Sequence, residues 1–317
     1  MNVIIIGCGQ LGSRHSQSIA KHPGVTKIVL VDPSNHSLDT AVERIHTTGF
    51  EGSIETYNSI ENHLGSFRLA IVSTSAGERA AALSSLMLHT SPDHVLLEKL
   101  LSPNLIGLDE IERLTQSSNV QFWVNCPMPF YDHYQQITLE LNQTSGQEPI
   151  SYNIVGSDFG LVTNFIHYLD HFHTLTGSAV ATLTIEPNAI LIASKRNGYS
   201  ELLGTITAET EYGDKLSVEF LNDRPQDVLI VDIQKGALSW TVDELGLTLK
   251  KRGVDGHIAE SHITTPMQSE LTHLSLNNLK NGLAPAWSPL ATSIELHKKL
   301  HQGLANYLGS NSTVVFT

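Results

Sequence analysis

A glycine-rich segment near the start of the chain constrains the fold more than any other feature. Gly7, Gly9 and Gly12 form the pattern Gly-x-Gly-x-x-Gly directly after the apolar run at residues 3–6. A continuous apolar run is typical of a strand that is covered on both faces of a parallel sheet. A helical pattern follows at residues 11–21. Strand, glycine turn and helix in this order predict the first unit of a dinucleotide-binding domain.

Each glycine has a separate physical role in such a motif. Gly7 permits the tight turn, and Gly9 lets the backbone approach a pyrophosphate at the helix N-terminus. Gly12 permits close packing of the helix on the strand. Gln10 and Leu11, which lie between these glycines, are expected to contact the cofactor as well. A glycine turn that binds no ligand is the alternative.

Asp32 follows the next apolar run and lies twenty residues beyond Gly12. At that place a carboxylate accepts hydrogen bonds from the adenosine ribose hydroxyls and repels a 2′-phosphate. The sequence therefore predicts NAD in preference to NADP. A neighbouring cation would favour a phosphate instead, but Pro33, Ser34 and Asn35 supply none.

The alternation of strand and helix patterns continues to residue 125. Strands are expected at residues 28–31, 69–72, 94–97 and 120–124, and helices at 78–89 and 105–115. This order predicts an α/β Rossmann domain, with a doubly wound parallel sheet, over residues 1–125.

After residue 125 closely spaced strand patterns replace the alternation. They lie at residues 151–155, 180–186, 202–209, 216–221, 228–233, 237–240 and 245–249. Helices are expected at residues 131–141, 164–175, 268–280 and 288–308. Residues 126–317 are thus predicted to form an α+β domain for substrate binding and oligomerisation, with an open, mainly antiparallel sheet.

The overall charge restricts the classes of partner. The chain has 32 acidic and 19 basic residues, a formal net charge of −13. Nucleic-acid binding is not expected, because it requires clustered Lys and Arg. The sequence shows no basic leader and no apolar run of the ~18–20 residues that a membrane helix needs. With two cysteines only, we expect a reduced, soluble, cytoplasmic protein without membrane contact.

Polar residues follow two of the expected parallel strands. Ser73 and Thr74 come after the strand at 69–72, and Glu98 and Lys99 come after the strand at 94–97. Ligands of open α/β sheets bind at the carboxyl ends of the strands. We therefore expect all four residues at the cofactor site.

The helix at 164–175 carries a second polar group. Asn164, His167 and His171 share one of its faces, because they lie three or four residues apart. A histidine buried in the core is the alternative for His167. Helical His pairs also bind zinc, but with 16 histidines in the chain close pairs occur by chance, and we expect no metal.

These segments together resemble the Gfo/Idh/MocA family, named after glucose–fructose oxidoreductase and inositol dehydrogenase. The resemblance covers essentially the whole chain. It rests on the order of the two domains, the Glu98-Lys99 pair, the His-x-x-Asp sequence that begins at His167, and a late helix in which His297 precedes two lysines.

The resemblance implies an NAD(P)-dependent oxidoreductase of carbohydrate metabolism. In this family a hydride passes between the nicotinamide and a secondary hydroxyl or keto group of a sugar, sugar acid or nucleotide sugar. Carried over, Lys99 contacts the reacting hydroxyl, His167 is the general base, and Asn164 orients the substrate. The family also implies a homodimer or homotetramer through the sheet of the second domain.

Three features depart from the family pattern. One is the segment Cys126-Pro127-Met128, where members often carry Arg or Lys, so a different substrate pocket is expected. Leu100 replaces the usual proline after the lysine, and a cis peptide before a non-proline residue costs about 2.5–4 kcal/mol, so a trans bond is expected. Thr163 replaces an aspartate that many members carry four residues before the histidine. These departures leave two alternatives open: a dinucleotide-binding sensor or scaffold without turnover, and glycoside hydrolysis through transient oxidation.

Overall fold

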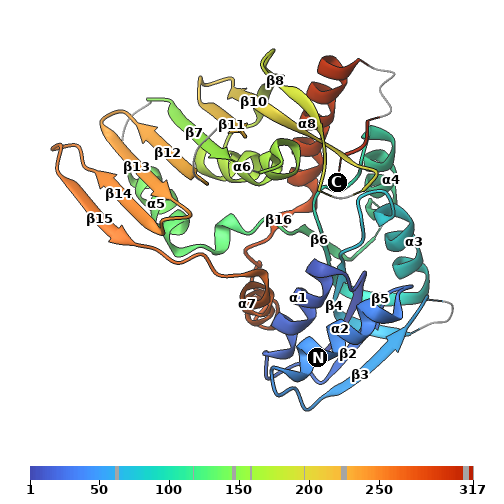
Figure 1. Cartoon of the computed structure of the whole chain (residues 1–317). Coiled ribbons are helices and arrows are strands. Elements are labelled where there is room, and N and C mark those ends of the chain that lie inside the picture. The colour runs from blue at the N-terminus through green and yellow to red at the C-terminus, as the bar shows by residue number, and fades with distance from the viewer. Residues whose placement is uncertain are drawn as a thin grey trace. The chain divides into compact units, whose positions relative to one another are not determined.

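The computed structural model describes residues 1–60, 64–116, 118–144, 148–157, 159–195, 197–222, 227–309 and 314–316 (Figure 1). The chain divides into two compact units. Unit 1 comprises Met1–Pro127 and Pro266–Ile294, and unit 2 comprises Met128–Thr265 and Glu295–Phe316. Pro266–Ile294 was expected in the second domain, but it packs within unit 1.

Within its described residues, unit 1 is built on a seven-stranded sheet of order β16-β6-β5-β4-β1-β2-β3. Every neighbouring pair is parallel except β16 and β6. The strands are β1 (Asn2–Ile6), β2 (Lys27–Val31), β3 (Ser53–Tyr57), β4 (Gly65–Val72), β5 (Thr90–Leu97), β6 (Gln121–Val124) and β16 (Ser288–Pro289). The predicted doubly wound parallel sheet is confirmed.

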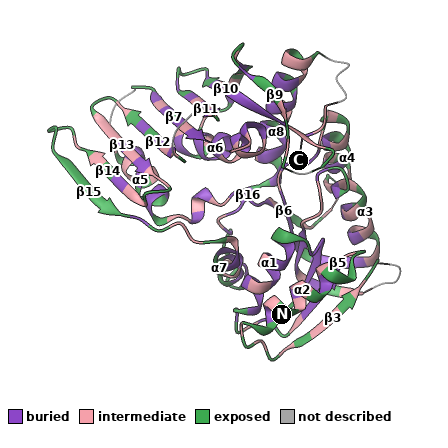
Figure 2. Cartoon of the chain, viewed as in Figure 1, coloured by how far each residue is buried: buried purple, intermediate pink, exposed green. Residues whose placement is uncertain are grey.

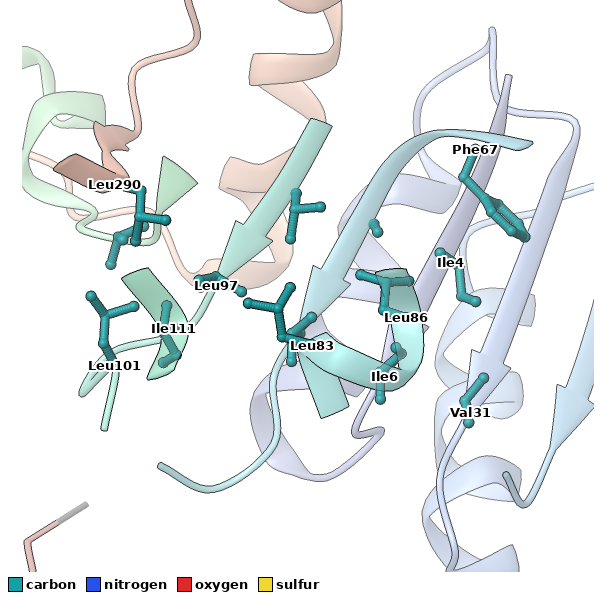
Figure 3. Packing of buried hydrophobic residues seen from close by; sticks show 14 of the residues in the cluster. Ile4, Ile6, Val31, Phe67, Leu83, Leu86, Leu97, Leu101, Ile111 and Leu290 are labelled. Atoms are coloured by element: carbon teal, nitrogen blue, oxygen red, sulfur yellow. The ribbon is translucent and has the colours of Figure 1, made fainter. Parts of the chain in front are cut away.

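Helices of unit 1 complete its core. They are α1 (Gln10–Ala20), α2 (Asn35–His46), α3 (Arg79–His89), α4 (Leu105–Thr115) and α7 (Gln268–Lys280). Leu83 and Leu86 of α3 and Ile111 of α4 belong to one buried cluster with residues of the central strands, such as Ile4 and Leu97 (Figure 3). The strands are apolar on both faces because the sheet is covered on both faces.

Helix α7 packs beside α1 (Figure 1). Polar side chains make this contact. The ring of His15 lies 2.8 Å from the Thr272 hydroxyl, and the Ser18 hydroxyl lies 3.1 Å from the ring of His273. The late segment therefore joins unit 1 through hydrogen bonds as well as apolar packing.

Within its described residues, unit 2 contains a nine-stranded sheet of order β15-β14-β13-β12-β7-β11-β10-β8, with β9 paired to β10. Of these strands only β7 and β11 pair in parallel. The strands are β7 (Ile150–Ser157), β8 (Val180–Ile185), β9 (Ile190–Ala193), β10 (Ser200–Thr210), β11 (Lys215–Leu221), β12 (Leu229–Lys235), β13 (Leu238–Asp243), β14 (Thr248–Arg252) and β15 (Ile258–His262). The predicted, mainly antiparallel sheet is confirmed.

One face of this sheet is covered and the other is polar. The helices of unit 2 are α5 (Asp132–Gln143), α6 (Leu161–Thr176) and most of α8 (Leu290–Leu308). Along β12, Val231 and Ile233 are buried, whereas Asp232 and Gln234 are exposed. Figure 2 shows that α6 is buried over most of its length and that β15 is exposed. This alternation is typical of a sheet with one solvated face.

In the described part of the chain, no helix combines the length and the apolar character needed to cross a bilayer.

Candidate functional site

The glycine motif forms a tight turn between β1 and α1 in unit 1. Gly7 has a φ of +84°, which favours glycine. A Cβ at Gly12 would lie 1.8 Å from the carbonyl oxygen of Gly7 and 2.7 Å from Oγ of Ser73. Only a glycine at position 12 therefore lets the helix approach the turn so closely.

Gly9 differs from the other two because it faces open space. A Cβ built at Gly9 would meet no atom within 4 Å. Gly9 is also the N-cap residue of α1 and provides no side-chain cap. Gln10 and Leu11, which open the helix, are exposed. Because the N-terminus of a helix favours anions, the turn has both the space and the electrostatic potential that a pyrophosphate requires.

Asp32 lies directly after β2 and is held by backbone groups. Its Oδ2 accepts a hydrogen bond of 2.7 Å from the Cys8 amide, and its Oδ1 accepts one of 2.8 Å from the Ser34 amide. Burial, together with the charge of Asp32, raises the pKa of the Cys8 thiol to about 12. The thiol therefore stays protonated, and the Asp32 carboxylate is held in place by two backbone amides.

Arg44 is a cation near the glycine turn that the residues next to Asp32 in the sequence did not predict. Arg44 belongs to the last turn of α2, and its guanidinium donates to the carbonyl of Gln10 at 3.4 Å and to the hydroxyl of Ser13. The segment after Asp32 lacks a cation, but α2 supplies one from 34 residues beyond Gln10.

Ser73 and Thr74 lie against the glycine turn, as their position after β4 indicated. The Ser73 hydroxyl donates to the carbonyl of Gly7 at 2.7 Å, and the Thr74 amide lies 2.8 Å from the ideal Cβ position of Gly7. Ser73 thus fixes the shape of the turn from the neighbouring strand.

Glu98 points into a buried polar network. Its carboxylate lies 2.8 Å from Nε2 of His15 and accepts a hydrogen bond of 2.6 Å from the amide of Asn125. Burial alone would raise the pKa of Glu98, but His15, Arg79 and Asn125 outweigh it and hold the pKa below its ordinary value. The expected contact of Glu98 with the cofactor stays a prediction, and its contacts in unit 1 anchor the end of β5. His15 and Asn125 were missed by sequence reasoning.

The peptide between Lys99 and Leu100 is cis. The expectation of a trans bond was therefore wrong. The groups around the bond are tightly held: Leu100 is fully buried, and the buried guanidinium of Arg79 donates to the carbonyl of Leu100 and to that of Thr74. Tertiary contacts of this kind override the local preference of the chain. The Lys99 side chain itself is partly exposed next to this anchored segment.

Helix α6 of unit 2 carries Asn164 and His167. Both are partly exposed, while most of the helix is buried. The side-chain amide of Asn164 donates to the carbonyl of Gly160 at 2.7 Å, one turn earlier. The face that the sequence predicted for Asn164 and His167 is thus the accessible side of the first two turns.

A glutamate from another element caps this helix. Glu201 of β10 is buried, and its carboxylate accepts hydrogen bonds of 2.6 Å from the Val162 amide and 2.6 Å from the Thr163 hydroxyl. Position 163 itself is a threonine, but β10 places the Glu201 carboxylate beside it. Sequence reasoning missed Glu201, although an acidic residue before the apolar pair Leu202-Leu203 was a usable signal.

His171 shares a face with His167 in the sequence but belongs to the core of unit 2. Its Nδ1 lies 2.9 Å from the Tyr152 hydroxyl, and burial, with a smaller contribution from His133, lowers its pKa to about 3. Its ring also packs on Tyr134, at 4.6 Å between ring centroids. Among the described residues no group of three or more His, Cys, Asp or Glu could hold a metal ion.

Comparisons with known proteins agree with this geometry. Residues 1–126 match the model of the Gfo/Idh/MocA family, which is described as an oxidoreductase family with an NAD-binding Rossmann fold. No curated protein has a sequence that matches the chain.

Several solved structures share the fold of the whole chain. A UDP-N-acetylglucosamine 3-dehydrogenase from Acidithiobacillus ferrooxidans is 14% identical, with 96% of each chain covered and a TM-score of 0.70. An oxidoreductase from Agrobacterium radiobacter, in complex with NAD⁺, L-tartaric acid and magnesium, is 15% identical, with 97% of each chain covered and a TM-score of 0.73. GenD2 from gentamicin A biosynthesis, in complex with NAD, is 13% identical over 97% of this chain and 95% of its own, with a TM-score of 0.72.

These likenesses extend over both units, and the family match covers the glycine turn, Asp32 and the Glu98-Lys99 pair. By this match, residues 1–126 form an NAD-binding Rossmann domain of the kind found in Gfo/Idh/MocA oxidoreductases, and the chain as a whole shares the fold of these solved structures.

Proposed function

We propose that the protein is an NAD-dependent dehydrogenase or reductase that acts on a secondary hydroxyl or keto group of a sugar, sugar acid or nucleotide sugar. The observation that carries the proposal is the glycine turn itself, which leaves open space at Gly9 and fixes the Asp32 carboxylate beside it. The sugar class is supported by relatives in fold that are named for a nucleotide sugar and for gentamicin A biosynthesis.

When bound, NAD accepts or supplies the hydride. The first turn of α1 and Gly9 would hold the pyrophosphate, and Asp32 would accept hydrogen bonds from the ribose hydroxyls. Ser73 and Thr74 would shape the cofactor side of the sheet edge. The partly exposed Lys99 side chain would lie near the cofactor because it follows β5 at that edge.

Proton transfer is assigned to Lys99 and His167. Oxidation of a secondary alcohol requires that the hydroxyl proton leaves as the carbon loses its hydride, so a base that titrates near neutral pH is needed. Histidine is the side chain that meets this requirement without a large perturbation. We propose that His167 takes the proton, that Lys99 donates a hydrogen bond to the reacting oxygen, and that Asn164 orients the substrate.

Absorbance of reduced nicotinamide tests this function directly. Purified protein is mixed with NAD or NADP and a panel of polyols, sugar acids and nucleotide sugars. Lys99→Ala is expected to lower turnover about 10²–10⁴-fold. Lys215→Ala is the matched control, because Lys215 is exposed and pairs with Glu209, and it should leave turnover unchanged.

Other outcomes would favour the alternatives. Tight NADH binding without turnover of any substrate would indicate a sensor or scaffold. Release of a sugar without net NADH would indicate hydrolysis through transient oxidation.

The preference for NAD is tested at Asp32. Asp32→Asn removes the charge that repels a 2′-phosphate. The affinity for NADPH relative to the affinity for NADH should therefore rise about tenfold or more in fluorescence titrations, which corresponds to about 1.4 kcal/mol of binding free energy. Asp39→Asn on the exposed side of α2 is the control. An unchanged ratio of the two affinities would assign cofactor choice to another group, for which Arg44 is the candidate.

Self-association is proposed through the open face of the unit 2 sheet. That face is polar along β12, so the interface would rely on hydrogen bonds between side chains. Light scattering that gives a strict monomer would contradict this proposal.

A further inference from the structure

The N-terminus of α6 is capped by a residue from a distant strand. The helix has no side-chain cap of its own at Gly160. Instead, the Glu201 carboxylate accepts hydrogen bonds from the amide of Val162 at 2.6 Å and from the amide of Thr163 at 3.2 Å. These are two of the amides at a helix start that have no partner within the helix.

The carboxylate of Glu201 is buried and accepts four hydrogen bonds. Glu201 is 4% exposed, and burying a carboxylate is costly unless it is hydrogen-bonded. Besides the two helix amides, it accepts hydrogen bonds from the Thr163 hydroxyl at 2.6 Å and from the Leu202 amide at 3.0 Å. The positive end of the helix dipole stabilises the negative charge at the same point. The carboxylate is therefore fixed in one position.

The backbone approaches this contact closely. A Cβ at Gly160 would lie 2.3 Å from Oε2 of Glu201, so the residue before the helix must be a glycine for the carboxylate to approach. Glu201 also belongs to β10. Its own part of the strand pairs with β9, and the following residues of the strand pair with β11 and β8. The first turn of α6 is thus attached to a hydrogen-bonded strand.

The first two turns of α6 carry Asn164, to which substrate orientation is assigned, and His167, to which proton transfer is assigned. Asn164 directly follows Thr163, and its side chain bonds back to the Gly160 carbonyl at 2.7 Å. His167 lies one turn later on the same face. Any rotation or fraying of the first turn would therefore move both side chains together.

We propose that Glu201 is a positioning residue, which fixes the first turn of α6 and thereby the orientation of Asn164 and His167. This role rests on the proposed function. A 1 Å misplacement in a catalytic group can lower a rate by about 100-fold, so a cap that fixes the helix start has a direct effect on turnover.

The first test compares two glutamates of the same strand. Glu201→Gln keeps the size of the side chain but places an NH₂ group against amides that also donate, so at least one bond is lost. We expect kcat/KM to fall about tenfold or more, mainly through kcat, while the Kd for NADH stays unchanged. Glu209→Gln, which removes only an exposed carboxylate of β10 paired with Lys215, should change neither.

The second test moves the charge from the strand to the helix. Thr163→Asp alone places a second carboxylate about where the Thr163 hydroxyl meets Glu201, and like charges at that distance repel, so kcat/KM should fall. In the double variant T163D/E201Q the side-chain amide introduced on β10 donates to the carboxylate introduced on α6. The capping charge is restored from the other side, and kcat/KM should return to within about threefold of wild type.

Measurements without turnover separate this inference from the proposed function. In Glu201→Gln the amides of Val162 and Thr163 should lose protection from hydrogen exchange, and the NMR signals of the His167 ring should shift. Both should recover in the double variant. Unchanged His167 ring signals in Glu201→Gln, or a lower Tm with unchanged kcat and KM, would overturn the positioning role. A wild-type protein without turnover would contradict the proposed function alone, and the ring signals would still decide this inference.

Discussion

Nε2 of His15 lies 2.8 Å from the carboxylate of Glu98, and both side chains are buried in unit 1. Removing one partner leaves the other without its hydrogen bond in a buried place, at a cost of about 1–3 kcal/mol or more. His15→Ala should therefore lower the free energy of unfolding of the protein by at least that amount, measured by urea denaturation.

A surface pair in the same unit is the control for this prediction. Nζ of Lys27 lies 2.7 Å from Oε1 of Glu55, but the two side chains are 28% and 40% exposed. Exposed pairs contribute about 0–1 kcal/mol, so Glu55→Gln should have little effect. Equal losses in the two variants would show that burial does not strengthen the His15–Glu98 contact.

Two glycines of the turn have different roles: Gly9 is expected to serve cofactor binding, and Gly12 serves stability. Gly12→Ala should destabilise the protein by about 1–3 kcal/mol, because its Cβ would overlap the Gly7 carbonyl. Gly9→Ala should leave the Tm nearly unchanged, because a Cβ there meets no atom of the protein, yet it should abolish NADH binding. Thermal melts and NADH fluorescence check the two effects, with Gly77→Ala, at another open position, as control. Retained NADH binding in Gly9→Ala would show that the pyrophosphate lies elsewhere.

Acidification should destabilise unit 2 through the buried His171. Burial lowers the pKa of His171 to about 3, against an ordinary value of 6.5. Between these pH values the unfolded chain binds a proton that the folded chain excludes, so the free energy of unfolding falls as the pH falls. One such group contributes up to about 1.4 kcal/mol per pH unit.

Urea denaturation at a series of pH values tests the histidine prediction. His171→Gln should reduce the slope of the unfolding free energy between pH 6.5 and pH 4.5, while retaining an acceptor for Tyr152. His257→Gln, at an exposed position, should leave that slope as it is. An unchanged slope in His171→Gln would mean that the ring is protonated in the folded protein.

The sequence predicted those elements that bury an apolar pattern. The helices expected at residues 105–115 and 268–280 have the same bounds in the structure. Three elements of unit 1 were missed: α2, β3 and the two-residue strand β16, whose residues were expected to begin a helix. Only three residues of α2 are buried, and β3 is an edge strand without a fully buried residue. β15 was missed because all of its residues are exposed.

The association of α7 with unit 1 depends on polar contacts as well as on its buried leucines. The helix contacts α1 through pairs such as Ser18 and His273, whose side chains are 3.1 Å apart. Polar residues on each helix predict solvent exposure when each helix is considered alone. Only the tertiary structure shows that these side chains satisfy each other.

The candidate site was predictable where its residues are close in sequence. The glycine turn and Asp32 lie together as expected, because their spacing is fixed by one strand and one helix. The contacts of Glu201 with Thr163 and of Glu98 with His15 join residues 38 and 83 positions apart. A single sequence contains no information on such pairings until the sheet order is known.

The chain leaves unit 1 at Pro127 and returns to it at Pro266. During synthesis on the ribosome, domains generally fold from the N-terminus onward as they emerge. Here the Rossmann unit emerges first but receives α7, and with it the Thr272 partner of His15, only after all the strands of unit 2 up to β15 have been made. Residues 1–127 are therefore not an independent module, and a gene fusion or fragment that ends there would expose the polar side of α1 and leave the His15–Glu98 pair without its third partner.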